Sequence, residues 1–232
     1  VLVVGAALRA VRVTGTLLVS ERSNRKMENE MADRNIVTET LTYEGGGVTM
    51  QGYIAYDANE GPRPGVMIIH EWWGLDDYIK SRARQVAELG YTAVALDMYG
   101  DGKVAANSDE AGALMMGVLG DMESGTARLK AGHAAMCAHA NTDGTRTASM
   151  GYCFGGAVSL HAARIGMDLR AVASFHGSLG SFHTPEVGSV KPKILVCHGA
   201  ADVLIPADDV TAFKAEMDGA GADYEFVEYE GA

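Results

Sequence analysis

One cysteine stands in a setting that could make it a nucleophile. Residues 150–156 read Met-Gly-Tyr-Cys-Phe-Gly-Gly, between an expected buried strand over 145–151 and an apolar helix expected over 154–165. The pattern Gly-x-Cys-x-Gly is typical of a nucleophile elbow, a sharp strand-to-helix turn at the carboxyl edge of a sheet. Glycine is needed there because larger side chains would collide with the strand and helix that meet. Cys153 is therefore the candidate nucleophile, and the N–H of Phe154 is a candidate oxyanion donor.

The other two cysteines have no such setting. Cys137 falls within an expected helix and Cys197 near the end of an apolar strand, so we interpret both as buried structural residues. A structural role is also the alternative for Cys153, but the order of strand, glycine turn and helix favours the nucleophile. Three scattered cysteines without a Cys-x-x-Cys pair indicate neither a disulfide framework nor a zinc site, and we expect no metal or cofactor.

A carboxylate that could orient a base follows a later strand. Asp202 lies in the loop after the expected strand 193–197, where a carboxylate could hold an imidazole. The alternative for Asp202 is a turn or helix-capping residue before Pro206. Enzymes with this elbow present the histidine last in chain order. None of the seven histidines follows Asp202.

Three histidines precede this acid at the ends of expected strands, namely His70, His176 and His198. Each could line the mouth of a site. We interpret them as hydrogen-bonding wall residues. The alternative is that one of them is a relocated base, because a catalytic triad is defined by its geometry and chain order is only a guide.

The elements that must position these groups alternate between strands and helices. Two β-branched segments, 37–43 and 48–56, flank three glycines and predict an antiparallel hairpin. Further strands are expected over 65–70, 91–97, 145–151, 169–175, 193–197 and 224–229, and helices over 77–89, 105–139 with a break near Gly120, 154–165 and 207–219. Such alternation predicts one α/β domain with a mostly parallel sheet and helices on both faces.

Composition narrows the classes of partner. The 232 residues carry a formal net charge of -11, which argues against binding to nucleic acid or to an anionic membrane. Free thiols favour a reducing, cytoplasmic location. Residues 1–20 are apolar, but Arg9 and Arg12 interrupt them, so we expect 1–34 to be a poorly ordered or non-native extension. A secretory signal is the alternative, and the domain is expected over 35–232.

From about residue 37 to its end, the sequence resembles the dienelactone hydrolase family of the α/β-hydrolase superfamily. The resemblance rests on His70-Glu-Trp-Trp-Gly74, Ala95-Leu-Asp-Met-Tyr99, Gly151-Tyr-Cys-Phe-Gly-Gly156, Ser174-Phe-His-Gly177 and His198-Gly-Ala-Ala-Asp202. It implies an α/β-hydrolase fold and hydrolysis of small esters or lactones. The implied catalytic group is a Cys-His-Asp triad in which Cys153 and Asp202 take two of the three places.

The resemblance also implies roles for neighbouring residues. Glu71 would contact the resting thiol, although a surface charge beside two indoles is the alternative. The N–H groups of Trp72 and Phe154 would form the oxyanion hole. Family members carry the histidine just after a Tyr-x-Gly-Ala segment, which residues 229–232 match. We therefore expect the base to lie beyond Ala232, the C-terminal segment of the domain to be missing, and the chain to be inactive as it stands.

The substrate pocket departs from the dienelactone-cleaving members. These carry an arginine shortly after an Asp-x-Tyr segment, whereas this chain reads Tyr99-Gly-Asp-Gly-Lys103. Lys103 offers a point charge without the guanidinium fork. With Trp73, Tyr99 and His176, it is expected to line a pocket for small esters or lactones other than dienelactone itself.

Two other functions remain open from the sequence. A glutamine amidotransferase also uses a Gly-x-Cys-x-Gly elbow, but it pairs the cysteine with a His-x-Glu element, and none follows Cys153. A catalytically inactive, hydrolase-like binding protein is the second alternative, because loss of one triad member costs several orders of magnitude in rate. The sequence gives no indication of the oligomeric state.

Overall fold

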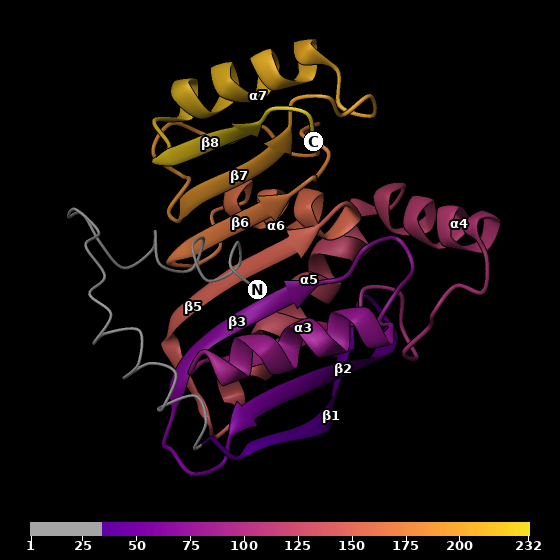
Figure 1. Cartoon of the computed structure of the whole chain (residues 1–232), viewed down its shortest axis with the longest axis vertical. Helices are drawn as coiled ribbons and strands as arrows, with labels where there is room; N and C mark the ends of the chain where they lie inside the picture. The colour runs from indigo at the N-terminus through magenta and orange to yellow at the C-terminus, as the bar shows by residue number, and fades with distance from the viewer. Residues whose placement is uncertain (1–33) are drawn as a thin grey trace.

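The structure, a computed structural model, describes residues 34–232 (Figure 1). Expectations for residues 1–33 fall outside the described residues. The strands form one sheet in the order β1-β2-β4-β3-β5-β6-β7-β8. They span β1 Ile36–Gly45, β2 Val48–Asp57, β3 Arg63–Ile69, β4 Thr92–Leu96, β5 Thr142–Tyr152, β6 Ala171–Phe175, β7 Lys193–Gly199 and β8 Tyr224–Tyr229. The pairs β1–β2 and β2–β4 are antiparallel, and all later pairs are parallel.

Five helices connect these strands within the described part of the chain. They are α3 Asp77–Glu88, α4 Ser108–Leu119, α5 Met122–Ala138, α6 Phe154–Arg164 and α7 Ala207–Ala220. The break expected near Gly120 is confirmed, because α4 ends there and the Asp121 side chain caps α5 by accepting from the N–H of Ser124 at 3.1 Å. Among residues 34–232, no helix is long and apolar enough to cross a membrane.

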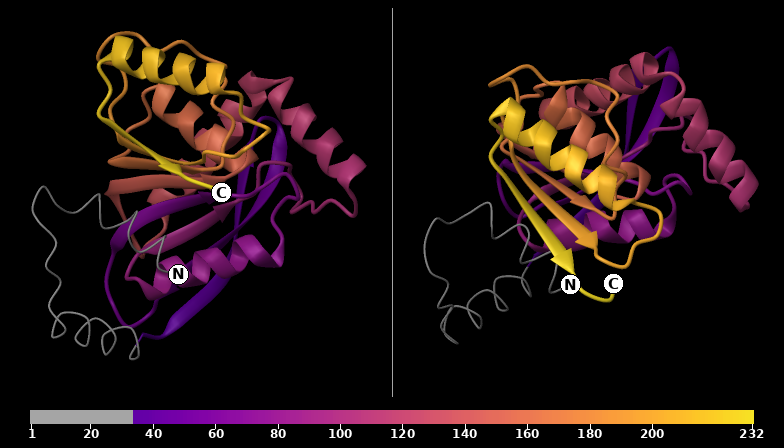
Figure 2. Two further views of the ribbon diagram at one scale, coloured as in Figure 1. Left: turned by 45° about the horizontal axis from the view of Figure 1, so that its top comes forward. Right: turned by 90° about the horizontal axis from the view of Figure 1, so that it is seen from above.

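Helices lie on both faces of the sheet (Figure 2), and each face has its own core. On one face, helices α5, α6 and α7 cover side chains such as Leu96, Val172 and Val196. On the other face, α3 buries its Ile79 and Val86 against the sheet residues that alternate with the first set, including Ile68. This period-2 alternation is what a sheet buried on both faces requires. The α/β architecture expected from the sequence, including its N-terminal hairpin, is therefore confirmed.

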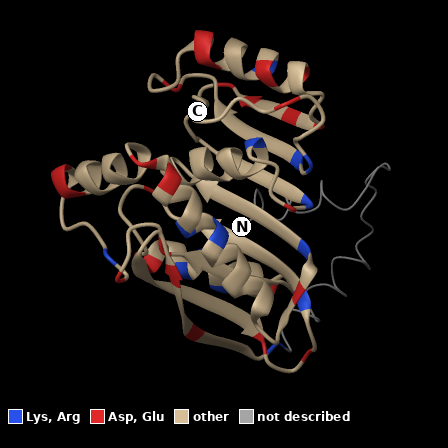
Figure 3. Cartoon of the chain, turned by 180° about the vertical axis from the view of Figure 1, so that it is seen from behind, with Lys and Arg blue, Asp and Glu red and all other residues tan. Residues whose placement is uncertain are grey.

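Most element boundaries agree with the expected ones, and the differences are local. Strand β5 begins at Thr142, earlier than expected, because it continues past an irregular register between Pro64 and Gly65 of β3. Strand β7 continues to Gly199 through its parallel pairing with β8. Acidic residues lie in the first turn of α4 and along α7 (Figure 3).

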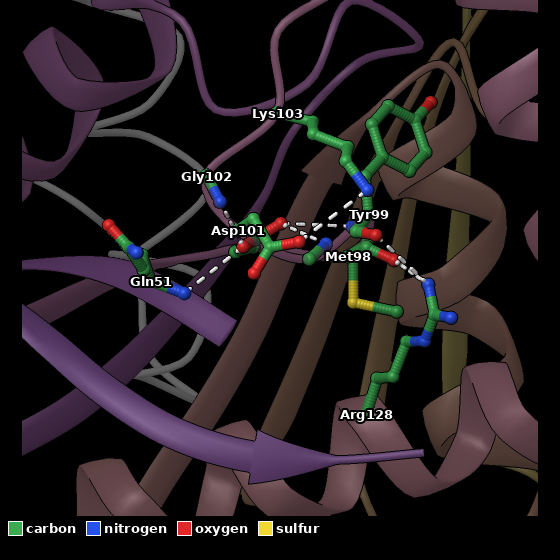
Figure 4. A network of polar contacts seen from close by, with 9 residues as sticks. Gln51, Met98, Tyr99, Asp101, Gly102, Lys103 and Arg128 are labelled. Atoms are coloured by element: carbon green, nitrogen blue, oxygen red, sulfur yellow. Dashed lines mark hydrogen bonds and ion pairs between the residues drawn. The ribbon is translucent and has the colours of Figure 1, made fainter. Parts of the chain in front are cut away.

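A buried carboxylate fixes the loop that follows β4. Asp97 is fully buried and accepts hydrogen bonds from four backbone N–H groups, those of Gln51, Tyr99, Gly100 and Gly102, at 2.8–3.0 Å. From α5, the guanidinium of Arg128 donates to the carbonyl oxygens of Met98 and Tyr99 (Figure 4). The four hydrogen bonds that the Asp97 carboxylate accepts are charge-assisted and compensate for the cost of burying it. They hold Tyr99 at the edge of the sheet where the parallel strands end.

Candidate active site

Cys153 lies on a strained turn between β5 and α6. Its φ is 51° and its ψ is -115°, a conformation that residues with a side chain rarely adopt. A Cβ added to Gly151 would collide with the backbone of Gly155, and one added to Gly155 would collide with the carbonyl oxygen of Ile69. The two glycines therefore let the strand, the turn and the helix approach closely. This is the geometry expected of the elbow.

The surroundings of Cys153 keep its thiol protonated. Burial raises the pKa of the Cys153 thiol, and the negative charges of Glu71 and Asp202 raise it further. A hydrogen bond from the N–H of Phe154 lowers this pKa, but the net direction is upward. The thiol needs a base to become a nucleophile at neutral pH, since the thiolate is the reactive form.

Two backbone N–H groups are available near the thiol. The N–H of Phe154, at the start of α6, is directed at the sulfur. The N–H of Trp72 has no acceptor among residues 34–232, and its carbonyl oxygen accepts from the Tyr99 hydroxyl at 2.8 Å. Tyr99 is close to the nucleophile, because the charge of Cys153 adds to burial in raising the pKa of Tyr99. Unpaired N–H groups at such a turn can stabilise an oxyanion.

Glu71 follows β3 and is half-buried beside the elbow. Burial raises the pKa of the Glu71 carboxyl, and the nearby Asp76 raises it further, whereas His176 and Arg82 act in the opposite direction. In the described part of the chain, no hydrogen bond joins Glu71 to the thiol of Cys153. The two side chains interact through space, and the predicted direct contact is not seen.

Asp202 makes a short side-chain contact at this edge of the sheet. Its Oδ2 lies 2.6 Å from Nδ1 of His176, and its Oδ1 accepts from the N–H of Leu204 at 2.9 Å. The Asp202 side chain is 7% exposed, whereas that of His176 is 49% exposed. The carboxylate is thus fixed by its loop and contacts the imidazole of His176, and its role in a catalytic triad stays a prediction.

The other two strand-end histidines are buried. His70 is enclosed, with its Nδ1 2.5 Å from the carbonyl oxygen of Glu71 and its Nε2 accepting from the N–H of Met98 at 3.2 Å. Burial lowers the pKa of His70, so the ring is neutral and serves as a spacer between two strand ends. His198 is also buried, and its ring lies 5.6 Å from that of Phe226. Both rings are enclosed, so neither lies at the exposed mouth of the site.

The predicted pocket residues divide into two groups. Trp72 and Trp73 meet edge to face with ring centroids 5.1 Å apart, and the ring of Tyr99 stacks on that of Phe154 at 5.8 Å. Lys103 is different. Its ammonium lies 3.6 Å from the Asp101 carboxylate, half of its side chain is exposed, and no hydrogen bond or ion pair within residues 34–232 joins it to the elbow.

Arg82 is a neighbour of the site that the sequence did not indicate. From α3, its guanidinium lies over the rings of Tyr78 and Tyr152, at 4.8 Å and 5.9 Å from their centroids, and it interacts with Glu71 through space. The i,i+4 spacing of Tyr78 and Arg82 was the available signal. No group of three or more metal-binding side chains occurs in the described part of the chain.

Comparison with known proteins gives a consistent result. A sequence model described as the dienelactone hydrolase family matches residues 50–232. The chain is similar to the protein usf of Aquifex pyrophilus, with 31% identity over 198 residues, covering 83% of this chain and 84% of that protein. Two solved structures each share 33% identity and cover 85% of this chain and 82% of theirs. One, named m3DLH, has a TM-score of 0.81, and the other, a dienelactone hydrolase-like promiscuous phosphotriesterase from metagenomic libraries, has 0.78. The expected α/β-hydrolase fold is confirmed.

Proposed function

This chain belongs to the dienelactone hydrolase family, and for that reason we propose that it hydrolyses ester or lactone bonds of small molecules with Cys153 as the nucleophile. The observation that carries the proposal is the strained elbow at Cys153, with φ of 51° and the N–H of the next residue directed at the sulfur. A cysteine with a purely structural role would not need a strained backbone conformation.

In the proposed reaction, the thiol of Cys153 loses its proton to an imidazole, and the thiolate attacks the acyl carbon. The N–H groups of Trp72 and Phe154 stabilise the oxyanion of the tetrahedral intermediate. The alcohol leaves with the proton from the imidazole, and water then cleaves the thioester. Asp202 keeps the imidazole in the orientation and tautomer that these transfers need.

Other residues tune this reaction. The carboxylate of Glu71 disfavours the thiolate while the site is empty and thereby limits oxidation of the sulfur. The two indoles and Tyr99 supply an apolar wall for the acyl group. Lys103 remains a proposed pocket residue only if its loop moves, since it now pairs with Asp101.

Several finer expectations remain predictions. The family resemblance places the histidine after Ala232, outside this sequence, and a cytoplasmic location follows only from the free thiols. Small neutral esters or lactones are the proposed substrates.

The direct test is hydrolysis of p-nitrophenyl acetate, followed by release of p-nitrophenol and by the mass of the intact protein. Turnover by this chain, or by a chain translated beyond Ala232, is expected to depend on Cys153 and to pass through an acetylated protein. The substitution Cys153→Ala should abolish both signals. If neither chain acetylates at Cys153, the esterase function is rejected.

A further inference from the structure

We propose that His133 and Cys137 bind a zinc ion at a site separate from the elbow. The two residues are one turn apart on α5, so their side chains lie on the same face of that helix. They approach β5, whose Thr147 and Gly144 supply oxygen atoms. None of these four residues takes part in the proposed hydrolysis, so the site is an additional one.

The distance between the two strong ligands fits a shared metal ion. Sγ of Cys137 lies 3.6 Å from Nε2 of His133. Zinc bonds sulfur at about 2.3 Å and imidazole nitrogen at about 2.0–2.1 Å, so a tetrahedral angle at the metal places the two atoms about 3.6 Å apart. An ion between these atoms would therefore require almost no movement of either side chain.

Two oxygen atoms lie beside the sulfur and the nitrogen. The Thr147 hydroxyl donates to the carbonyl oxygen of Asp168 at 3.2 Å and lies 3.0 Å from Nε2 of His133. Because its proton is engaged by that carbonyl, the hydroxyl presents a lone pair to the imidazole. The carbonyl oxygen of Gly144 lies 3.9 Å from Sγ of Cys137, a long contact even for a thiol donor. These oxygens and water would fill the positions that the two strong ligands leave open.

The charge and the exposure of the site also suit a cation. Burial raises the pKa of the Cys137 thiol and lowers that of the His133 imidazole, and the negative charge of Asp168 raises both. Asp168 has no ion-pair partner among residues 34–232, so its charge is left for an added cation. Cys137 is half-buried, where the sequence predicted a buried residue, and an ion can reach it from solvent.

The types of ligand select the ion. Thiolate and neutral imidazole are ligands that Zn²⁺ prefers, whereas Mg²⁺ and Ca²⁺ take oxygen ligands. Only two strong ligands are present, in agreement with the lack of a larger metal-binding group within residues 34–232. Binding should therefore be reversible. The metal takes the place of the thiol proton, and one proton passes to solvent for each ion bound.

The test titrates Cd²⁺, a spectroscopic substitute for Zn²⁺, into the 232-residue chain carrying Cys153→Ala, which removes the elbow thiol. A bound thiolate gives an ultraviolet charge-transfer absorption from sulfur to cadmium. We expect this absorption to saturate at one equivalent, and an excess of Zn²⁺ to remove it. A further Cys137→Ser should abolish it. A further His133→Gln should weaken binding at least about 10-fold, because even the loss of a residue behind a ligand costs that much.

His139→Gln is the matched control. His139 follows the same helix but contacts Glu39 at 3.1 Å instead of the thiol, so its variant should bind cadmium as the parent does. Thermal denaturation without metal shows which variants are folded, and if Cys137→Ser or His133→Gln does not fold, the other decides.

Three results would overturn the site. The first is a Cys153→Ala chain that shows no charge-transfer absorption. The second is an absorption that survives Cys137→Ser, which would place the ion at Cys197. The third is a His133→Gln chain that binds cadmium as tightly as its parent, which would leave a thiol without its imidazole. None of these results bears on hydrolysis by Cys153.

Discussion

Cys153 and His176 occupy equivalent positions, each one residue beyond the last pair of two adjacent parallel strands, and each has a positive φ, 51° and 52°. Two neighbouring strands thus end in strained residues whose side chains lie at the same edge of the sheet. Backbone hydrogen bonds at 3.0 Å tie each residue to the strand next to it. Both residues are held by the sheet itself, which gives them less freedom than a long surface loop would.

Loss of the thiol should remove the reaction. We expect Cys153→Ala to reduce turnover of p-nitrophenyl acetate by at least about 10³-fold, because no other thiol stands at an elbow. Cys137→Ala is the matched control, since Cys137 lies in α5, and it should retain the activity. Intact-protein mass spectrometry checks the acetylated intermediate. A Cys153→Ala protein that still acetylates would assign the chemistry to another residue.

Removing the charge of Glu71 should make the thiol more acidic. The Glu71 carboxylate raises the pKa of Cys153, so Glu71→Gln should lower that pKa. More of the thiol should then be present as thiolate at neutral pH. Alkylation by iodoacetamide at neutral pH is expected to be several-fold faster, with its pH profile displaced to lower pH. Glu88→Gln, an exposed position at the end of α3, should leave the profile unchanged. A slower reaction in Glu71→Gln would contradict the assigned effect of this carboxylate.

The elbow should not accept a larger residue on its strand side. A Cβ at Gly151 would collide with the backbone of Gly155, so Gly151→Ala should destabilise the fold by about 2 kcal/mol or more. Gly117 lies in α4 with open space around it, and Gly117→Ala should stabilise by up to about 1 kcal/mol. Urea denaturation measures both. Equal effects of the two substitutions would show that the close approach at Gly151 is not rigid.

The Asp97 carboxylate should be needed for the loop that holds Tyr99. In Asp97→Asn, the amide nitrogen would face N–H donors, and we expect a loss of about 3 kcal/mol in the free energy of unfolding. Asp101→Asn changes an exposed residue of the same loop that pairs with Lys103 at 3.6 Å, and its effect should stay within about 0.5 kcal/mol. Thermal and urea denaturation would show the difference. If Asp97→Asn leaves the free energy of unfolding unchanged, water can replace the four hydrogen bonds that Asp97 accepts.

Most of the fold could be predicted because its signals are local. The alternation of expected strands with expected helices defined the strands from β3 to β8, and the glycines between residues 45 and 47 marked the hairpin. The elbow at Cys153 was visible for the same reason: strand, turn and helix lie within a few residues of each other. Asp202 could be named because loops after parallel strands meet at one edge.

The partner of Asp202 could not be settled from the sequence. It depends on which strands are neighbours and on their register, and β6 lies between β5 and β7 only once the sheet order is known. His176 was therefore interpreted as a wall residue with a relocated base as the alternative. The role of Asp97 was missed likewise, since its donors come from β2 and from the loop after β4. Arg82 reaches the site from α3, and its position depends on how that helix packs on the sheet.

The residues from Cys153 to Asp202 form one uninterrupted stretch of chain that contains β6 and β7 and is joined to β5. Proteins open in cooperative units, and contiguous strands commonly open together. A single local opening of this stretch would separate the side chains of Cys153, His176 and Asp202 in one event while β1–β4 stay paired. Heat inactivation should then coincide with accelerated amide hydrogen exchange in β6 and β7 and precede exchange in the N-terminal half of the sheet.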